Sequence, residues 1–165
     1  MVQTQTVPIF PLHYHPRDYD IFVGLDVDKK KFLVTMMDHA DDRKSLTLPY
    51  SADQLIRTVR SRFPGQRVIF AYEAGPTGYG LYDQLTQAGY RCLVVSPSMI
   101  PRPANERVKT NRLDSQKIAE NLRGGQLKTI HVPSLPYRHL RYLVQLRDVA
   151  VQQAASGKCR INRCC

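Results

Sequence analysis

The segment Ile21-Phe22-Val23-Gly24-Leu25-Asp26-Val27 decides the fold. Its apolar run predicts a strand buried inside a sheet. The strand carries one carboxylate, Asp26, and a carboxylate in such a place is costly unless a metal ion or a hydrogen-bonding partner compensates it. Asp26 therefore indicates a polar or metal-binding site at the end of this strand.

The segments that follow predict a mixed sheet. Two further strands, Lys31–Met37 and Lys44–Pro49, follow with short connections and favour an antiparallel meander. The later strands Val68–Glu73 and Arg91–Val95 alternate with helices, which favours parallel pairing by crossover connections. The helices are expected from Ser51 to about Phe63, from Thr77 to Gly89 and from Ser115 to Arg123. This order predicts an α/β fold with a ribonuclease H-like mixed five-stranded sheet, flanking helices and a long C-terminal helix.

The two ends of the chain differ from this middle part. Residues 1–20 contain Pro8, Pro11 and Pro16 and no sustained period, which predicts a flexible N-terminal arm. Residues 133–165 predict a helical, coiled-coil-like arm from Tyr137 to Arg163, interrupted at Ser156-Gly157. Because the apolar face of this helix has nothing to cover it, we expect a homo-oligomer formed through it.

The charge balance favours a nucleic-acid partner. The 165 residues include 24 Lys and Arg against 14 Asp and Glu, a net charge of +10. Such a balance is typical of proteins that bind a phosphate backbone, although a basic surface also serves solubility alone. No apolar run approaches the ~20 residues of a membrane span, and no signal-peptide pattern opens the chain. We therefore expect a cytoplasmic protein without a membrane partner.

Three carboxylates are candidates for one metal site. Asp26 lies in the first strand, Glu73 ends the fourth, and Asp114 precedes a later helix. Converging at strand ends, they would supply the hard oxygen ligands that magnesium requires. The alternatives are that Glu73 is a surface acid before a Gly-Pro turn and that Asp114 is a helix-start acid near the dipole.

Four motifs together resemble the IS110-family transposases. They are Val23-Gly24-Leu25-Asp26-Val27, Tyr72-Glu73-Ala74-Gly75, Val108-Lys109-Thr110-Asn111-Arg112-Leu113-Asp114 and Ile118-Ala119-Glu120-Asn121-Leu122-Arg123. The resemblance is to the N-terminal RuvC-like domain with its DEDD active site, covers about Ile21 to Ala150, and assigns residues 21–132 to that domain. It implies a ribonuclease H-like fold, magnesium and site-specific DNA recombination that moves an insertion sequence. In some members a structured RNA guides target choice.

By position, the resemblance implies that Asp26, Glu73, Asn111 and Asp114 occupy the four catalytic positions. The chain departs from the family at Asn111, where the family has aspartate. Asparagine offers a neutral oxygen and removes one negative charge, so the expected metal ligands are Asp26, Glu73 and Asp114. The resemblance also implies a second, C-terminal domain with a serine nucleophile, and we expect the chain to be incomplete without it. The alternative is a non-catalytic nucleic-acid-binding module or a decayed transposase fragment.

Basic residues around the third motif are expected to contact DNA phosphates. For any one of them a solvated charged face is the alternative. They are Arg102, Arg107, Lys109, Arg112 and Lys117.

Overall fold

The computed structural model of the protein describes residues 13–75, 78–96 and 111–161, with the backbone alone at 111–114 and 156–161. The chain divides into two compact units, one reaching Ile130 and the other beginning at His131. Each unit is described by itself.

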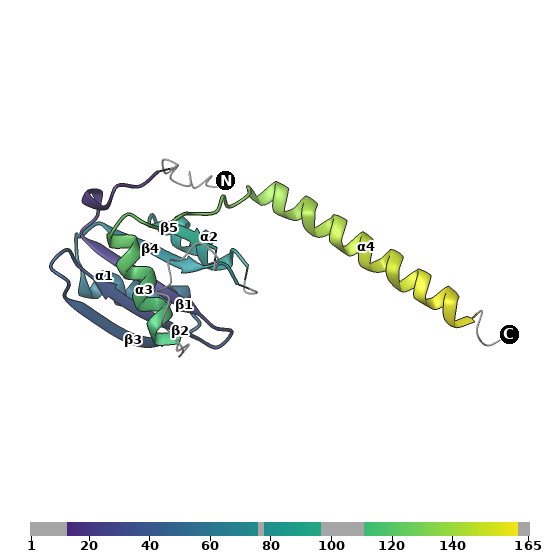
Figure 1. The fold of residues 1–165 in the computed structure, drawn as a ribbon, viewed down its shortest axis with the longest axis horizontal. Coiled ribbons are helices and arrows are strands. Elements are labelled where there is room, and N and C mark those ends of the chain that lie inside the picture. The colour runs from purple at the N-terminus through teal and green to yellow at the C-terminus, as the bar shows by residue number, and fades with distance from the viewer. Residues whose placement is uncertain (1–12, 76–77, 97–110, 162–165) are drawn as a thin grey trace, which may run out of the picture. The chain divides into compact units, whose positions relative to one another are not determined.

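A five-stranded mixed sheet forms the centre of the first unit (Figure 1). The strands lie in the order β3-β2-β1-β4-β5, with β2 antiparallel to β1 and to β3, β4 parallel to β1, and β5 parallel to β4. This arrangement confirms the predicted α/β, ribonuclease H-like fold. The strand bounds are β1 (Ile21–Val27), β2 (Lys31–Met37), β3 (Arg43–Pro49), β4 (Val68–Glu73) and β5 (Arg91–Val95).

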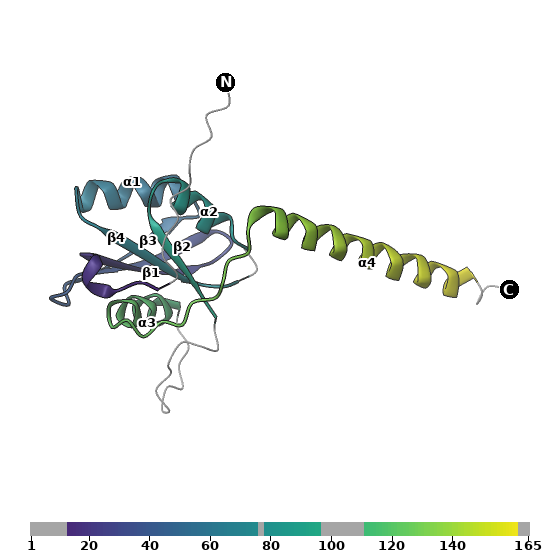
Figure 2. The same ribbon diagram turned by 90° about the horizontal axis from the view of Figure 1, so that it is seen from above.

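Helices cover both faces of the sheet (Figure 2). One face carries α1 (Ala52–Arg62) and α2 (Gly80–Gln87), and the other carries α3 (Asn111–Arg123). The start of α1 is set by Ser51, whose side-chain oxygen accepts a hydrogen bond from the backbone N–H of Gln54 at 3.3 Å. Its buried face then follows the helical period of Leu55, Ile56 and Val59.

Two helices begin elsewhere than predicted. α2 begins at Gly80 and not at Thr77, because Gly78 has a φ of 69°, which is outside the helical region. α3 already includes Asn111, four residues before the predicted start at Ser115. Ser115 lies within the helix, and its hydroxyl bonds to Thr35 of the sheet.

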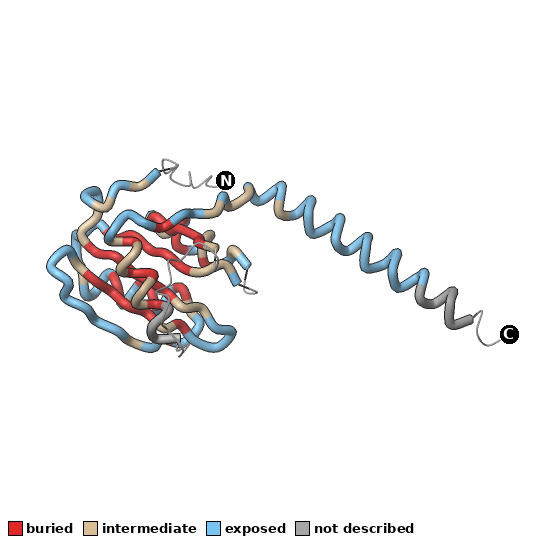
Figure 3. The backbone as a smooth tube through the Cα atoms, viewed as in Figure 1, coloured by how far each residue is buried: buried red, intermediate tan, exposed pale blue. Residues whose placement is uncertain are grey.

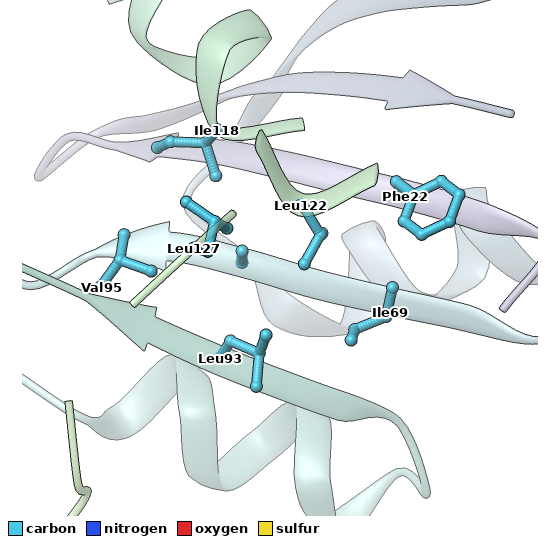
Figure 4. Close-up of a cluster of buried hydrophobic side chains, with 8 residues drawn as sticks. Phe22, Ile69, Leu93, Val95, Ile118, Leu122 and Leu127 are labelled. Atoms are coloured by element: carbon cyan, nitrogen blue, oxygen red, sulfur yellow. The ribbon is translucent and has the colours of Figure 1, made fainter. Parts of the chain in front are cut away.

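Apolar layers lie on both sides of the sheet, and Figure 3 shows the buried residues concentrated along the strands. The layer against α3 is a cluster of eight buried residues (Figure 4): Phe22, Ile69, Ala71, Leu93, Val95, Ile118, Leu122 and Leu127. On β5, Cys92 is buried, and burial raises the pKa of its thiol well above the usual range. This cysteine therefore acts as a small apolar residue.

Residues 13–20, which the sequence assigns to the N-terminal arm, lie against the sheet unit. The Tyr14 hydroxyl donates a hydrogen bond to the backbone oxygen of Leu122 at 3.1 Å. Both Tyr14 and Tyr19 pack against the apolar cluster under α3, and a short 3-10 turn, η1 (Pro16–Asp18), joins them. Two aromatic side chains thus anchor this stretch.

The second unit consists mainly of α4 (Leu135–Ile161). The helix continues through Ser156 and Gly157, so the predicted interruption there is wrong; a glycine in a helix costs only about 1 kcal/mol. No helix in the described ranges is both long and apolar enough to cross a membrane. Large apolar side chains of α4 are exposed: Leu135, Tyr137, Leu140, Tyr142, Leu143, Val144, Leu146, Val149 and Val151.

Candidate metal centre

Two of the predicted acids lie at the same end of neighbouring strands. β1 and β4 run parallel, and their pairing ends with Leu25 opposite Tyr72. Asp26 and Glu73 are the next residues on the two strands, about 5 Å apart at the backbone by the usual strand spacing. Both are half-buried. The structure therefore brings Asp26 and Glu73 together as the sequence predicted.

Both acids also point to the same face of the sheet. Side chains alternate along a strand, so Asp26 shares its face with Phe22, which belongs to the apolar cluster under α3. Glu73 shares its face with Ile69 and Ala71, which belong to the same cluster (Figure 4). The two carboxylates therefore lie on the side of the sheet that α3 covers.

The first turn of α3 lies toward these acids. Gly24 faces Ser115 and Ala119 of α3, whereas Phe22, two residues back along β1, lies on the side of the later residue Leu122 (Figure 4). α3 thus runs opposite to β1, and its start approaches the Asp26 end of the strand. That first turn contains Asn111 and Asp114, whose backbone is described and whose side chains lie outside the described part.

A glycine permits the close approach of α3 to β1. A Cβ atom at Gly24 would lie 2.2 Å from the backbone oxygen of Ser115 and 2.5 Å from the backbone nitrogen of Ala119. No real side chain tolerates such distances to backbone atoms. Gly24 is therefore required where it stands, two residues before Asp26 on the same face.

Hydroxyl groups fix the same helix to the neighbouring strand. The Thr35 Oγ1 atom on β2 lies 3.0 Å from Ser115 Oγ and 3.1 Å from Ser45 Oγ on β3. Thr35 and Ser115 are both buried. Because Thr35 pairs with Gly24 in the sheet register, the hydroxyl contact and the glycine contact hold the same segment of α3.

The far end of α3 is held by ion pairs. Arg43 at the start of β3 pairs with Glu120, and it also pairs with Asp41 at 2.7 Å. Arg123 pairs with Asp41 at 3.0 Å. The Arg43 side chain lowers the pKa of the Asp41 carboxyl, chiefly by hydrogen bonding. The helix is thus fastened at both of its described ends.

The donors at the candidate site suit magnesium. Asp26 Oδ2 is buried, and carboxylate oxygens are the hard ligands that magnesium prefers. Among the side chains that the structure describes, no group of three His, Cys, Asp or Glu could hold a metal ion. Asp26 and Glu73 are described, while the Asn111 and Asp114 side chains are not. The four-residue site therefore stays a prediction.

The predicted DNA-contacting residues fall mostly outside the described part. Arg102, Arg107 and Lys109 precede the first described residue of α3, and the Arg112 side chain lies outside the described ranges. Lys117 is described and is half-buried on α3. The fold does not test whether these residues contact a nucleic acid, so these contacts stay a prediction.

Sequence reasoning missed the hydroxyl contact between Thr35 and Ser115 and the role of Gly24. A glycine in the middle of an apolar strand is a signal for close backbone approach, so Gly24 could have been recognised. Thr35 carried no such signal, because an alternating strand places threonine equally well on either face.

Comparisons with known proteins agree with this geometry. Residues 23–164 match the model of the DEDD-type IS110 family, which is described as "Transposase". A protein of Sinorhizobium fredii named "Putative transposase y4qE" is 36% identical over 155 residues, covering 88% of this chain and 38% of the relative. The "Transposase for insertion sequence element IS1533" of Leptospira borgpetersenii is 26% identical over 110 residues, covering 65% of this chain and 32% of the relative. The chain thus spans about a third of the length of these relatives.

Proposed function

Because the chain belongs to the IS110 family of transposases, we propose that it forms the acid-bearing, magnesium-binding part of a recombinase that cuts and rejoins DNA to move an insertion sequence. The observation that carries this proposal is the placement of Asp26 and Glu73. They stand side by side at the carboxyl ends of β1 and β4, on the face covered by the start of α3. Acids in such a position are suited to act on a phosphodiester together.

In this proposal Asp26, Glu73 and Asp114 hold the metal, and Asn111 contributes a neutral oxygen. Bound magnesium would supply positive charge that stabilises the phosphodiester oxygens during strand cleavage. The residues of the chain itself orient the site: the sheet spaces Asp26 and Glu73, and the Thr35–Ser115 contact holds α3 over them.

The attacking hydroxyl comes, in this proposal, from a serine of a second domain. Ser115 is the single serine of α3, but it is buried and its hydroxyl is bonded to Thr35. That contact supports a structural role for Ser115.

We further propose that the protein acts in the cytoplasm and that a structured RNA guides target choice. Two or more copies associate, in this proposal, through the exposed apolar side chains of α4.

A second candidate function is a nucleic-acid-binding module without catalysis. Asn111 favours it, because the loss of one carboxylate lowers the negative charge available to a metal ion. The net charge of +10 supports phosphate-backbone binding equally well for both candidates.

Calorimetric titration with magnesium and with manganese tests the metal site. We expect Asn111→Asp to bind either ion about tenfold more tightly than the unsubstituted chain, which corresponds to about 1.4 kcal/mol. Asp26→Ala should abolish binding, and Asp53→Ala, an exposed acid on the opposite face, should leave it unchanged. If neither the chain nor Asn111→Asp binds an ion and Asp26→Ala changes nothing, the metal site is wrong. Duplex binding without magnesium-dependent nicking would select the second candidate.

A further inference from the structure

The connection between β1 and β2 is a tight turn with lysines at its tip. The backbone N–H of Asp28 donates to the backbone oxygen of Lys31 at 3.0 Å, which closes the turn around Lys29 and Lys30. The Asp28 carboxylate accepts a hydrogen bond from the backbone N–H of Lys29 at 2.6 Å. The lysines are therefore presented by a short, hydrogen-bonded hairpin between two seven-residue strands.

This hairpin stands at the same end of the sheet as the candidate metal centre. Asp26 pairs with Leu33 in the register of β1 and β2, so Lys31 lies two residues further along toward the turn. Two residues of strand span about 7 Å. By the alternation of faces, Lys31 also lies on the side that carries Asp26.

The two ends of the sheet differ in how their basic residues are compensated. At the opposite end, Arg43, Lys44 and Arg67 each pair with a carboxylate: Arg43 with Asp41 and Glu120, Lys44 with Asp42, and Arg67 with Asp20. At the Asp26 end, Lys29, Lys30 and Lys31 are exposed, and none pairs with a carboxylate among the side chains that the structure describes. Three lysines without a directly paired carboxylate among the described side chains therefore stand beside the acids.

We propose that Lys29, Lys30 and Lys31 bind the phosphodiester backbone of duplex DNA and hold the strand against the ends of β1 and β4. Lysine is a compact point charge that contacts phosphate without reading base sequence. The hairpin lies within about one Debye length (~10 Å at 0.1 M salt) of the acids, so it offsets the repulsion between carboxylates and an incoming phosphate. This inference rests on the proposed function and adds a contact surface separate from the third motif.

Two double variants that remove the same charge test the proposal. Lys29→Gln/Lys30→Gln changes the hairpin, and Arg57→Gln/Arg62→Gln changes exposed residues of α1 on the other face of the sheet. Duplex binding of the full chain is measured by fluorescence anisotropy over a series of salt concentrations. A single-stranded RNA and an RNA duplex of the same length serve as comparison probes.

We expect the hairpin variant to bind duplex DNA roughly tenfold more weakly and to lower the slope of log K against log salt by about 1.8, from about 0.9 for each lost phosphate contact. The α1 variant should change the affinity less than twofold. Equal effects of the two variants, or an unchanged slope in the hairpin variant, would overturn the inference while leaving DNA binding intact. A loss confined to the RNA probes would overturn the assignment to DNA. Absence of duplex binding by the unsubstituted chain would overturn the proposed function as well.

Discussion

Thr35 and Ser115 contact each other through their side-chain hydroxyls at 3.0 Å, although 80 residues separate them in the chain. The contact is buried and joins β2 to α3. It lies beside Gly24, which lets the helix reach β1. The start of α3, and with it the backbone of Asn111 and Asp114, is thus positioned by Thr35 and Ser115, which lie outside the four motifs, together with Gly24 of the first motif.

Replacing Thr35 by valine should loosen this end of α3. Thr35→Val keeps the volume but removes the hydroxyl between Ser115 and Ser45, which should lower the free energy of unfolding by about 2 kcal/mol. Thr35→Ser keeps the hydroxyl and loses one methyl group. Hydrogen exchange distinguishes them: the amides of residues 115–119 should exchange faster in Thr35→Val only. Equal protection of these amides in both variants would refute the role given to the hydroxyl.

Gly24→Ala should destabilise the sheet unit strongly. The new methyl group would collide with backbone atoms of Ser115 and Ala119, so α3 must move away from β1. We expect a loss of about 3 kcal/mol in urea-induced unfolding, at the upper end of overpacking effects. Gly80→Ala is the control, because no atom lies within 4 Å of a Cβ at that helical position. A Gly24→Ala variant as stable as Gly80→Ala would contradict the close approach.

Arg43→Leu should weaken the attachment of the other end of α3. Arg43 pairs with Glu120 and Asp41, and the arginine side chain is 34% exposed. Partly exposed pairs contribute little each, so the loss in the free energy of unfolding should be small at low salt and smaller still in about 1 M salt. Lys44→Leu removes a more exposed ion pair, in which Lys44 Nζ lies 3.6 Å from Asp42 Oδ2, and should lower the free energy of unfolding less than Arg43→Leu does. If the loss in the free energy of unfolding is the same at both salt concentrations, Arg43 stabilises the unit by packing and not by its ion pairs.

Tyr14→Phe should reduce the loss of stability at alkaline pH. Burial raises the pKa of Tyr14 from 10.0 to about 12, partly opposed by a hydrogen bond from the backbone of Leu127 and by the charge of Arg91. Below the pKa of the unfolded chain the phenol is protonated in both states, and this contribution to stability is complete. It is lost as pH rises from about 10 toward 12, because only the unfolded chain then ionises freely.

The free energy of unfolding at about pH 8 and about pH 11 checks this prediction. The difference between the two values should be smaller in Tyr14→Phe than in the unsubstituted chain. At about pH 8 the variant should lose about 1 kcal/mol with the hydrogen bond to Leu122. An unchanged difference would show that other groups cause the alkaline loss.

The strands of this fold were predictable because their signals are local. Ile21–Val27, Val68–Glu73 and Arg91–Val95 are apolar runs bounded by turn residues, and the structure has strands with these bounds. Ser51 was recognisable as a cap because its effect reaches only three residues along the chain. Predicting that Asp26 lies beside Glu73 required one further inference, namely that a crossover connection makes β1 and β4 parallel neighbours.

The contacts between distant segments were not predictable in the same way. The period of a helix identifies its apolar face but not the strand on which it packs, so the meeting of Ser115 with Thr35 carried no local signal. Tyr14 likewise belongs to a proline-rich stretch without periodicity, and its contact with Leu122 depends on the completed sheet unit. The start of α3 was predicted four residues too late, at Ser115, which lies inside the helix and makes a tertiary contact with Thr35.

Gly24 and Asp26 share a face because an even number of steps separates them. Insertion or deletion of one codon between them would leave the strand as apolar as before, yet it would turn the carboxylate into the layer beneath α1 and α2. The altered sequence would still align with its relatives at almost the same identity, while the protein would have no acid at this site. The parity of that spacing, more than the identity of Leu25, therefore decides on which face of the sheet the carboxylate lies.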